Sequence, residues 1–308
     1  MAIDRTAAQA LINVQNSNDI FEQAVNDSAA LRTFRTVQMT AKQHRMPVID
    51  VLPTAGFVTG EGNTALKPQA NVAWANKVLE AEEIATIVVI PENVFEDSSF
   101  NIWEAIRGRI AEAVGGILDG AVFFGTNKPA SWPAGLVPAS VTAGNVISAT
   151  DNAGDLAADL DAAITLVELD GYDPNTVYSD RRLRGNLRTL RDSAGMPIYN
   201  PSLRDGTVDT IYGLDIEWVR NGGWVPSGGT NVAPTGARAL VGDANMAILG
   251  LRQDMSMKIL TEATVGGVSL AETDQIGLRV KMRVAFQVAD PTTTEGGTAA
   301  FPFAVVRT

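Results

Sequence analysis

One strand near the end of the chain constrains the fold more than any other feature of the sequence. Apolar side chains occupy every second position over residues 276–288, and they are Ile276, Leu278, Val280, Met282, Val284, Phe286 and Val288. Because successive side chains of a strand point to opposite faces, this alternation predicts a strand with one buried face. Arg279, Lys281 and Arg283 lie on the other face. The predicted strand exceeds the usual length of about five or six residues.

A long amphipathic helix is predicted over residues 98–124. Its apolar side chains recur at spacings of three and four and form one stripe, made of Trp103, Ile106, Ile110, Val114, Ile117 and Ala121. Asp97 or Ser98 can cap its start, and Gly125 provides its end. Gly115 and Gly116 within it indicate a bend or close packing by another backbone.

Residues 151–260 alternate between helices and short strands. Helices are predicted over 155–169 and 181–191, and a hairpin is predicted to turn at Tyr212-Gly213. This alternation predicts an α+β fold with a mostly antiparallel sheet.

Residues 46–90 predict a long two-stranded hairpin with a glycine-rich tip, which ends in the β-branched run 84–90. A lone two-stranded hairpin is marginally stable in water and exposes unpaired edges. We therefore expect neighbouring subunits to support it. Two short helices, predicted over 3–13 and 18–30, have too few large apolar residues to form a core and indicate an arm that lies on another surface.

Composition excludes several classes of site. The chain of 308 residues has no cysteine, a single histidine at position 44, and a net charge of −11. Disulfides and thiolate metal sites are therefore absent, and sequence-reading contact with nucleic acid, which needs a basic surface, is disfavoured. The apolar run 84–90 is too short to span a bilayer, and the N-terminus lacks the pattern of a signal peptide. We expect a soluble chain with no membrane partner.

Motifs for catalysis or cofactor binding are missing from the sequence. It contains neither a phosphate-binding loop nor the signatures of zinc, thiol or serine chemistry. Acidic pairs such as Glu82-Glu83 and Glu96-Asp97 could hold Mg²⁺ or Ca²⁺. Glu82-Glu83 is better explained as part of a solvated hairpin, and Glu96-Asp97 as acidic residues that favour the start of a helix through its dipole. We expect no cofactor, no metal and no enzyme activity, with a carboxylate–metal enzyme as an alternative.

One cluster of positive charge occurs in this acidic chain. The helix predicted over 181–191 contains Arg181, Arg184 and Arg188, together with Arg182 and Arg191. These side chains could pair with acidic groups of a neighbouring subunit or contact DNA. A solvated helix face is the other explanation. We favour ion pairs between subunits.

The order of these elements resembles the capsid fold of tailed bacteriophages, which encapsulins share. The stretch from Val78 is the most similar, and it reads VLEAEEIATIVVIPENVFEDSSFNIWEAIRGRIAEAVGGILDGAVFFG. Trp132-Pro133-Ala134-Gly135-Leu136 follows it, and the stretch from Leu278 through Pro291 to Val306 is also similar. The resemblance covers nearly the whole chain as an order of elements, although no single motif is as specific as a zinc signature.

The resemblance implies a division of the chain into the parts of that fold. These are an N-terminal arm over 1–35 and an extended loop over 53–83. The peripheral domain comprises 36–52, 84–132 and 261–308 and includes a spine helix over 98–124. The axial domain covers 133–260 and has a central antiparallel sheet flanked by helices.

The function that the resemblance implies is assembly. Copies are expected to form pentamers and hexamers that close into an icosahedral shell around double-stranded DNA, which they contact without reading its sequence. A portal, a separate scaffolding protein and a decoration protein are the further expected partners. The protein is expected in the virion, after synthesis in the host cytoplasm. An encapsulin compartment and a non-capsid virion protein, such as a tail tube subunit, are the alternatives.

Some members of the family join a loop lysine to an asparagine of a neighbouring subunit, with a glutamate as base. Lys67 lies near the loop tip, and an alignment anchored on Arg283 and Pro291 places Asp274 and Lys281 at the asparagine and glutamate positions. A carboxylate is a poor acyl acceptor and a lysine is no base for this step, so noncovalent contacts are expected. The candidate intersubunit residues are Lys67, Trp74, Asp274, Lys281, Arg181, Arg184 and Arg188.

Overall fold

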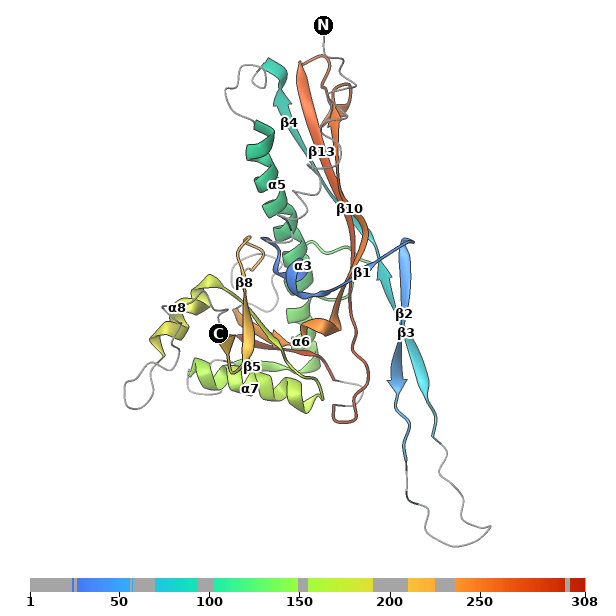
Figure 1. Ribbon diagram of the computed structural model, residues 1–308, viewed down its shortest axis with the longest axis vertical. Coiled ribbons are helices and arrows are strands. Elements are labelled where there is room, and N and C mark those ends of the chain that lie inside the picture. Colours follow the sequence, from blue (N-terminus) through green and yellow to red (C-terminus); the bar gives the residue numbers. More distant parts are fainter. Residues whose placement is uncertain are drawn as a thin grey trace.

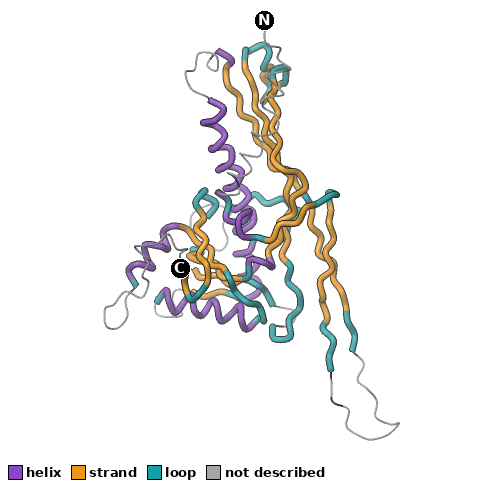
Figure 2. Tube along the Cα trace, viewed as in Figure 1, coloured by secondary structure: helices purple, strands orange, loops and turns teal. Residues whose placement is uncertain are grey.

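The computed structural model describes residues 24, 27–55, 57, 70–93, 102–148, 155–190, 210–224, 236–296 and 300–307. Two units and a projecting hairpin make up its elongated outline (Figure 1). One unit is a long four-stranded sheet with a helix beside it, and the other is a six-stranded sheet with helices. Figure 2 shows the hairpin pointing away from both units.

The long sheet has the strand order β1–β10–β13–β4. Its strands are β1 (Arg35–Gln38), β10 (Ala247–Leu260), β13 (Gln275–Val288) and β4 (Glu82–Pro91), and a small hairpin of β11 (Thr264–Val265) and β12 (Val268–Ser269) follows β10. β13 is antiparallel to both β10 and β4, whereas β1 is parallel to β10. The alternation predicted for β13 is confirmed, because its apolar positions from Leu278 to Val288 are buried while the three cations lie on the other face.

Helix α5 (Ile102–Asp119) lies beside this sheet and continues as one π-helical segment, η1 (Gly120–Phe124). The predicted end of the helix is confirmed by Gly125, whose φ of 70° reverses the chain. Ile117 is 55% exposed, so its predicted place in the buried stripe is wrong, and Leu118 is buried instead. The turn of 3.6 residues brings position 118 onto the line through Ile110 and Val114. Residues 98–101 lie outside the described residues.

The second unit is a six-stranded sheet with the order β5–β14–β9–β6–β8–β7. Its strands are β5 (Val146–Ser148), β14 (Phe303–Arg307), β9 (Ala237–Gly242), β6 (Thr176–Asp180), β8 (Leu214–Val219) and β7 (Thr210–Ile211). Three of its pairings are antiparallel, and β14–β5 and β6–β8 are parallel. Helix α6 (Leu136–Ala143) packs on one face, and α7 (Leu156–Leu169) and α8 (Arg181–Thr189) pack on the other.

Two strands, β10 and β14, lie in a different unit from the one expected from the sequence. Residues 247–260 were expected with the axial unit, yet they form β10 of the four-stranded sheet. Residues 303–307 were expected with the peripheral unit, yet they form β14 between β5 and β9. The chain passes between the sheets through the short helix η2 (Ala244–Met246) and again after β13. An apolar pattern shows which face of a strand is buried but not which strand is its partner.

The projecting hairpin consists of β2 (Gln43–Val51) and β3 (Ala73–Glu80). The run 84–90, which the sequence analysis placed in this hairpin, belongs to β4 of the long sheet. At the base, Leu79 and Ala81 pack against Met39, Ile248 and Ala285. Lys42 Nζ contacts Glu80 Oε1 at 2.9 Å, and this hydrogen bond raises the pKa of Lys42 and lowers that of Glu80.

Residues 28–34, which the sequence analysis assigned to an arm, belong to the core of their own subunit. Helix α3 (Ala29–Thr33) is followed by Phe34, whose ring lies 5.8 Å from Phe123 and 5.7 Å from Tyr178 between centroids. The carboxylate of Asp119 at the end of α5 holds the start of α3. The helices predicted over 3–13 and 18–30 fall almost wholly outside the described residues.

Candidate assembly surfaces

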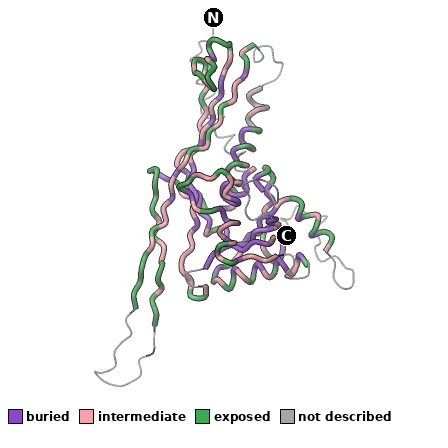
Figure 3. Tube along the Cα trace, turned by 180° about the vertical axis from the view of Figure 1, so that it is seen from behind, coloured by how far each residue is buried: buried purple, intermediate pink, exposed green. Residues whose placement is uncertain are grey.

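The outer half of the hairpin exposes large apolar side chains, and we call these four residues the hairpin surface: Val51, Phe57, Val72 and Trp74. Trp74 on β3 is 62% exposed, although a Trp usually buries about 150–250 Å² when it packs. Figure 3 shows exposed residues along both strands of the hairpin. Trp74 stays a predicted contact residue. The other three were not singled out from the sequence, because Val51 and Val72 lie in predicted strands and Phe57 is a single apolar residue in a glycine-rich stretch.

The ties between the described residues of the hairpin and the rest of the subunit lie near its base. Lys77 Nζ lies 2.6 Å from Asp290 Oδ1, and Gln287 Nε2 donates to the Val78 carbonyl over 3.1 Å. The last tie on β2 is at Ile49 and Asp50, whose carbonyls accept hydrogen bonds from Thr292. Among the described residues, β2 and β3 form a sheet with no third strand. On β2 the hairpin surface therefore begins, at Val51, just beyond the last tie found among the described residues.

The outer face of the long sheet carries a row of cations, which we call the cationic strip: Lys258, Arg279, Lys281 and Arg283. Lys258 on β10 is the direct cross-strand partner of Arg279 on β13, and like charges in this position repel. Within the part of the chain that the structure describes, none of the four forms an ion pair. The Nε atoms of Arg279 and Arg283 are buried and have no hydrogen-bond partner there.

Asp274 lies at the far end of the same sheet, in the turn before β13. Its φ of 47° is left-handed, and its carbonyl accepts a hydrogen bond of 2.9 Å from the Glu92 amide. Glu262 and Glu272 are also exposed at this end. Seven residues of extended chain separate Asp274 from Lys281, a distance of roughly 20 Å. The structure therefore does not bring these two predicted contact residues together within one copy, and Lys67 lies outside the described residues.

Helix α8 exposes its arginines on the surface of this subunit. Leu183 and Leu187 are buried against the sheet, while Arg181, Arg184 and Arg188 are exposed on the opposite side. The Arg184 guanidinium carbon lies 6.0 Å from the centre of the Trp218 ring. The helix starts at the cap Asp180, whose side chain accepts from the Arg182 amide. Arg191 lies outside the described residues.

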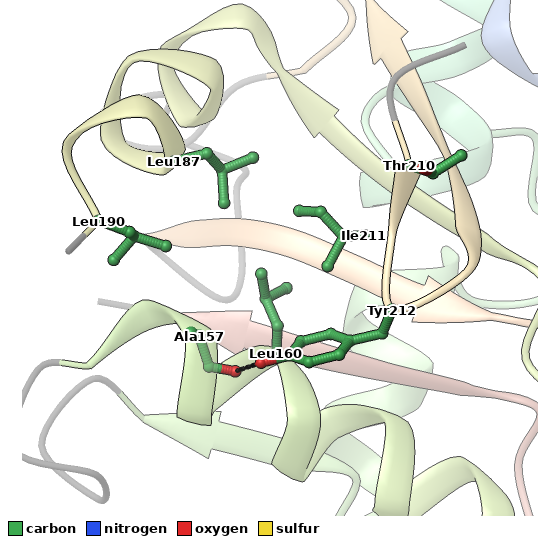
Figure 4. Close-up of a pocket in the computed structure, with 7 residues that line it drawn as sticks. All are labelled: Ala157, Leu160, Leu187, Leu190, Thr210, Ile211 and Tyr212. Atoms are coloured by element: carbon green, nitrogen blue, oxygen red, sulfur yellow. Dashed lines mark hydrogen bonds between the residues drawn. The ribbon is translucent and has the colours of Figure 1, made fainter. Parts of the chain in front are cut away.

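A hollow of about 230 Å³ separates α7 from α8 (Figure 4). It is lined mainly by apolar side chains: Ala157, Leu160, Leu187, Leu190, Thr210, Ile211 and Tyr212. The Tyr212 hydroxyl donates to the Ala157 carbonyl over 3.3 Å, and burial raises the pKa of this phenol. The described lining of the hollow is apolar apart from the hydroxyls of Thr210 and Tyr212.

Neither a metal centre nor a membrane span is found in the described part of the chain. Its acidic residues and His44 form no group of three that could hold a metal ion. No described helix is both long enough and apolar enough to cross a bilayer. What the described residues offer are exposed apolar and charged surfaces.

A well-packed core, a projecting apolar hairpin and exposed charged surfaces define a subunit built for assembly. The model of the phage capsid family matches residues 8–294. The chain belongs to the phage capsid family, and it is a structural protein of a capsid shell.

Solved structures are similar over the whole length of the chain. A protein of Microbacterium phage Oxtober96 is 42% identical, with 100% of this chain and 99% of that chain covered and a TM-score of 0.81. A protein of Mycobacterium phage Bobi is 34% identical, with coverage of 100% and 99% and a TM-score of 0.80. A capsid of a native GTA particle is 16% identical over 92% of this chain and 89% of that one, with a TM-score of 0.64, and shows the fold alone. No curated protein matches the chain.

Proposed function

We propose that copies of this chain form pentamers and hexamers that close into an icosahedral shell around a double-stranded DNA genome. The observation that carries this proposal is the hairpin surface, which projects from its own subunit and exposes Trp74 and three other large apolar residues. Large apolar side chains exposed together on one projecting element suit an interaction site. In a shell, every copy offers this surface to a neighbour, so the same contact is repeated around a closed assembly.

The hairpin gains stability from contact with a neighbouring subunit. Two strands without a third are marginally stable in water. Burial of apolar area stabilises by about 25 cal/mol per Å², and interface Trp residues often contribute more than 2 kcal/mol each. Contact with a neighbour therefore stabilises the hairpin and the assembly together. The extended-loop assignment of residues 53–83 rests on this argument.

The charged surfaces of the long sheet supply a second set of proposed contacts. One copy cannot join Asp274 to Lys281, because about 20 Å of strand lies between them. We propose that the acidic end around Asp274 meets the cationic strip of another copy, and that Lys67 contributes to contacts of the loop. A salt bridge of this kind is worth at most about 1 kcal/mol when exposed. Such contacts set orientation more than they set strength.

The placement of the two units and the further partners complete the proposal. The six-stranded unit, which includes β14, lies near the capsomer axis. The four-stranded sheet, which includes β10, lies toward the capsomer periphery. The net charge of −11 suits a wall that encloses DNA without binding it tightly. A portal, a separate scaffolding protein and a decoration protein are the remaining partners. The chain acts without enzyme activity, and it is made in the host cytoplasm.

Electron microscopy of particles formed by the chain tests this function. The unchanged chain is expected to form closed shells, whereas a variant that lacks residues 56–70 is expected to stay as folded subunits or capsomers. Trp74→Ala gives a finer test, since loss of an interface Trp should raise the protein concentration needed for shells by roughly 30-fold. Trp74→Phe retains most of the apolar ring and serves as the matched control.

Two outcomes would contradict the proposal. Open tubes in place of closed shells would assign the chain to another part of the virion. Normal shells from both the deletion and Trp74→Ala would show that the hairpin surface does not hold subunits together. Circular dichroism of the unassembled variants checks that the core still folds.

A further inference from the structure

Helices α7 and α8 carry opposite charges on their outward faces. Six carboxylates and no cation occur over residues 155–173, which include α7. Four arginines and no acid occur within α8. Both helices pack on the same face of the six-stranded sheet, and the apolar hollow lies between them (Figure 4).

The outward face of α7 is well defined. Asp161 and Glu168 are exposed, and neither forms an ion pair in the described part of the chain. Ala158, Ala162 and Thr165 lie between and beside them at spacings of three and four, so they share this face. Their small side chains allow another helix to approach closely. Other carboxylates of this region are committed to their own fold: Asp155 caps α7, and Asp170 accepts from Asn145.

The spacing of charges on the two helices matches. Asp161 and Glu168 are seven residues apart, and so are Arg181 and Arg188. Seven residues make about two helical turns, so each pair spans roughly 10.5 Å along one side of its helix. Two helices placed side by side in antiparallel directions can therefore join Asp161 to Arg188 and Glu168 to Arg181 at the same time. Arg184 then faces the small side chains between the acids.

We propose that, within a capsomer, the outward face of α8 in one copy docks on the outward face of α7 in the next copy. This inference rests on the proposed function and names the contact that α8 makes there. Helix α8 lies at the left of the six-stranded unit and α7 along its lower edge (Figure 1). Each copy can therefore offer α8 to one neighbour and α7 to the other, which is a head-to-tail contact that closes into a ring.

Charge-swap variants of the full chain test the contact. Arg181→Glu with Arg188→Glu should raise the protein concentration needed for shells by about tenfold, because two attractive pairs become repulsive. Asp161→Lys with Glu168→Lys should have the same effect. The fourfold variant, which exchanges the charges, should return to within about threefold of the unchanged chain. Folding should survive, because a Glu near the start of α8 and a Lys near the end of α7 suit the helix dipoles.

The control is a second fourfold variant with the same net charge. It combines Arg181→Glu and Arg188→Glu with Asp173→Lys and Asp254→Lys, which are exposed and lie off the α7 face. It should stay impaired. Equal rescue by both fourfold variants, or no rescue by the first, would overturn the contact. Shells that form normally from both double variants would also overturn the contact. If those shells held less DNA, α8 would instead be placed against the genome. Failure of the unchanged chain to form shells would instead overturn the proposed function.

Discussion

The hydroxyl of Ser28 donates a hydrogen bond of 2.7 Å to the carboxylate of Asp119, 91 residues further along the chain. The same carboxylate accepts from the amides of Ala29 and Ala30, at 3.0 and 3.1 Å, and from Asn221 Nδ2 at 2.7 Å. One buried side chain therefore connects the start of α3, the end of α5 and the segment after β8. It supplies the partners that the first amides of a helix otherwise lack.

Replacing this carboxylate should destabilise the subunit. Asp119→Asn keeps the shape of the side chain, but its amide group offers hydrogens to donors that need an acceptor. Buried donors left without partners cost on the order of 1–3 kcal/mol each, so we expect a loss of about 2 kcal/mol in the free energy of unfolding. Urea unfolding of the unassembled subunit measures it. Asp173→Asn changes an exposed carboxylate and should shift the free energy by less than about 0.5 kcal/mol.

The same carboxylate predicts a pH dependence. Burial raises the pKa of Asp119 above its ordinary value of 3.8, against the opposing effect of its hydrogen-bond donors. Between the unfolded and folded pKa values the folded state binds more protons, so stability falls as the pH rises through this window. The difference in unfolding free energy between the unchanged chain and Asp119→Asn should therefore shrink as the pH rises from about 4. A difference that grows with pH would mean that the donors outweigh burial.

Close packing along α5 gives a prediction with an internal control. A Cβ atom added to Gly116 would lie 2.9 Å from the backbone oxygen of Asn221, whereas one added to Gly185 in α8 would meet nothing within 4 Å. Gly116→Ala should cost about 1–3 kcal/mol through overpacking. Gly185→Ala should stabilise the subunit by up to about 1 kcal/mol, because Ala favours a helix. Thermal unfolding of both variants measures the two shifts, and equal shifts would refute the role of close packing.

Periodic sequence patterns predicted the elements that bury one face. The buried positions of β13, the end of α5 at Gly125 and the turn at Tyr212-Gly213, where φ is 50° and 82°, are all confirmed. Each of these features depends on neighbours in the sequence. The close approach that Gly116 permits was also anticipated, although its partner Asn221 was not.

Features that depend on distant segments could not be predicted in this way. The pairing of β10 with β13 and the entry of β14 into the six-stranded sheet join residues with no local signal of partnership. The role of Asp119 depends on donors from three segments, so an isolated Asp in a helix gave no indication of it. Lys258 joins the cationic strip only because the register places it opposite Arg279.

The last prediction is that the shell is held together without covalent cross-links between subunits. The alignment predicts Asp274 at the acyl-acceptor position, and this residue is an exposed carboxylate in a turn, which resists attack by an amine. The alignment places Lys281 at the position of the base, and a lysine cannot act as the carboxylate base of this step. On the outer face Lys281 lies between Arg279 and Arg283, and Glu83 of β4 is the cross-strand partner of Arg283. Particles boiled in detergent should therefore run as a single band near 32.6 kDa. A ladder of covalent oligomers would contradict this prediction. Loss of the ladder in Asp274→Ala would then identify Asp274 as the source of the acyl group, and a ladder that persists would show that another residue supplies it.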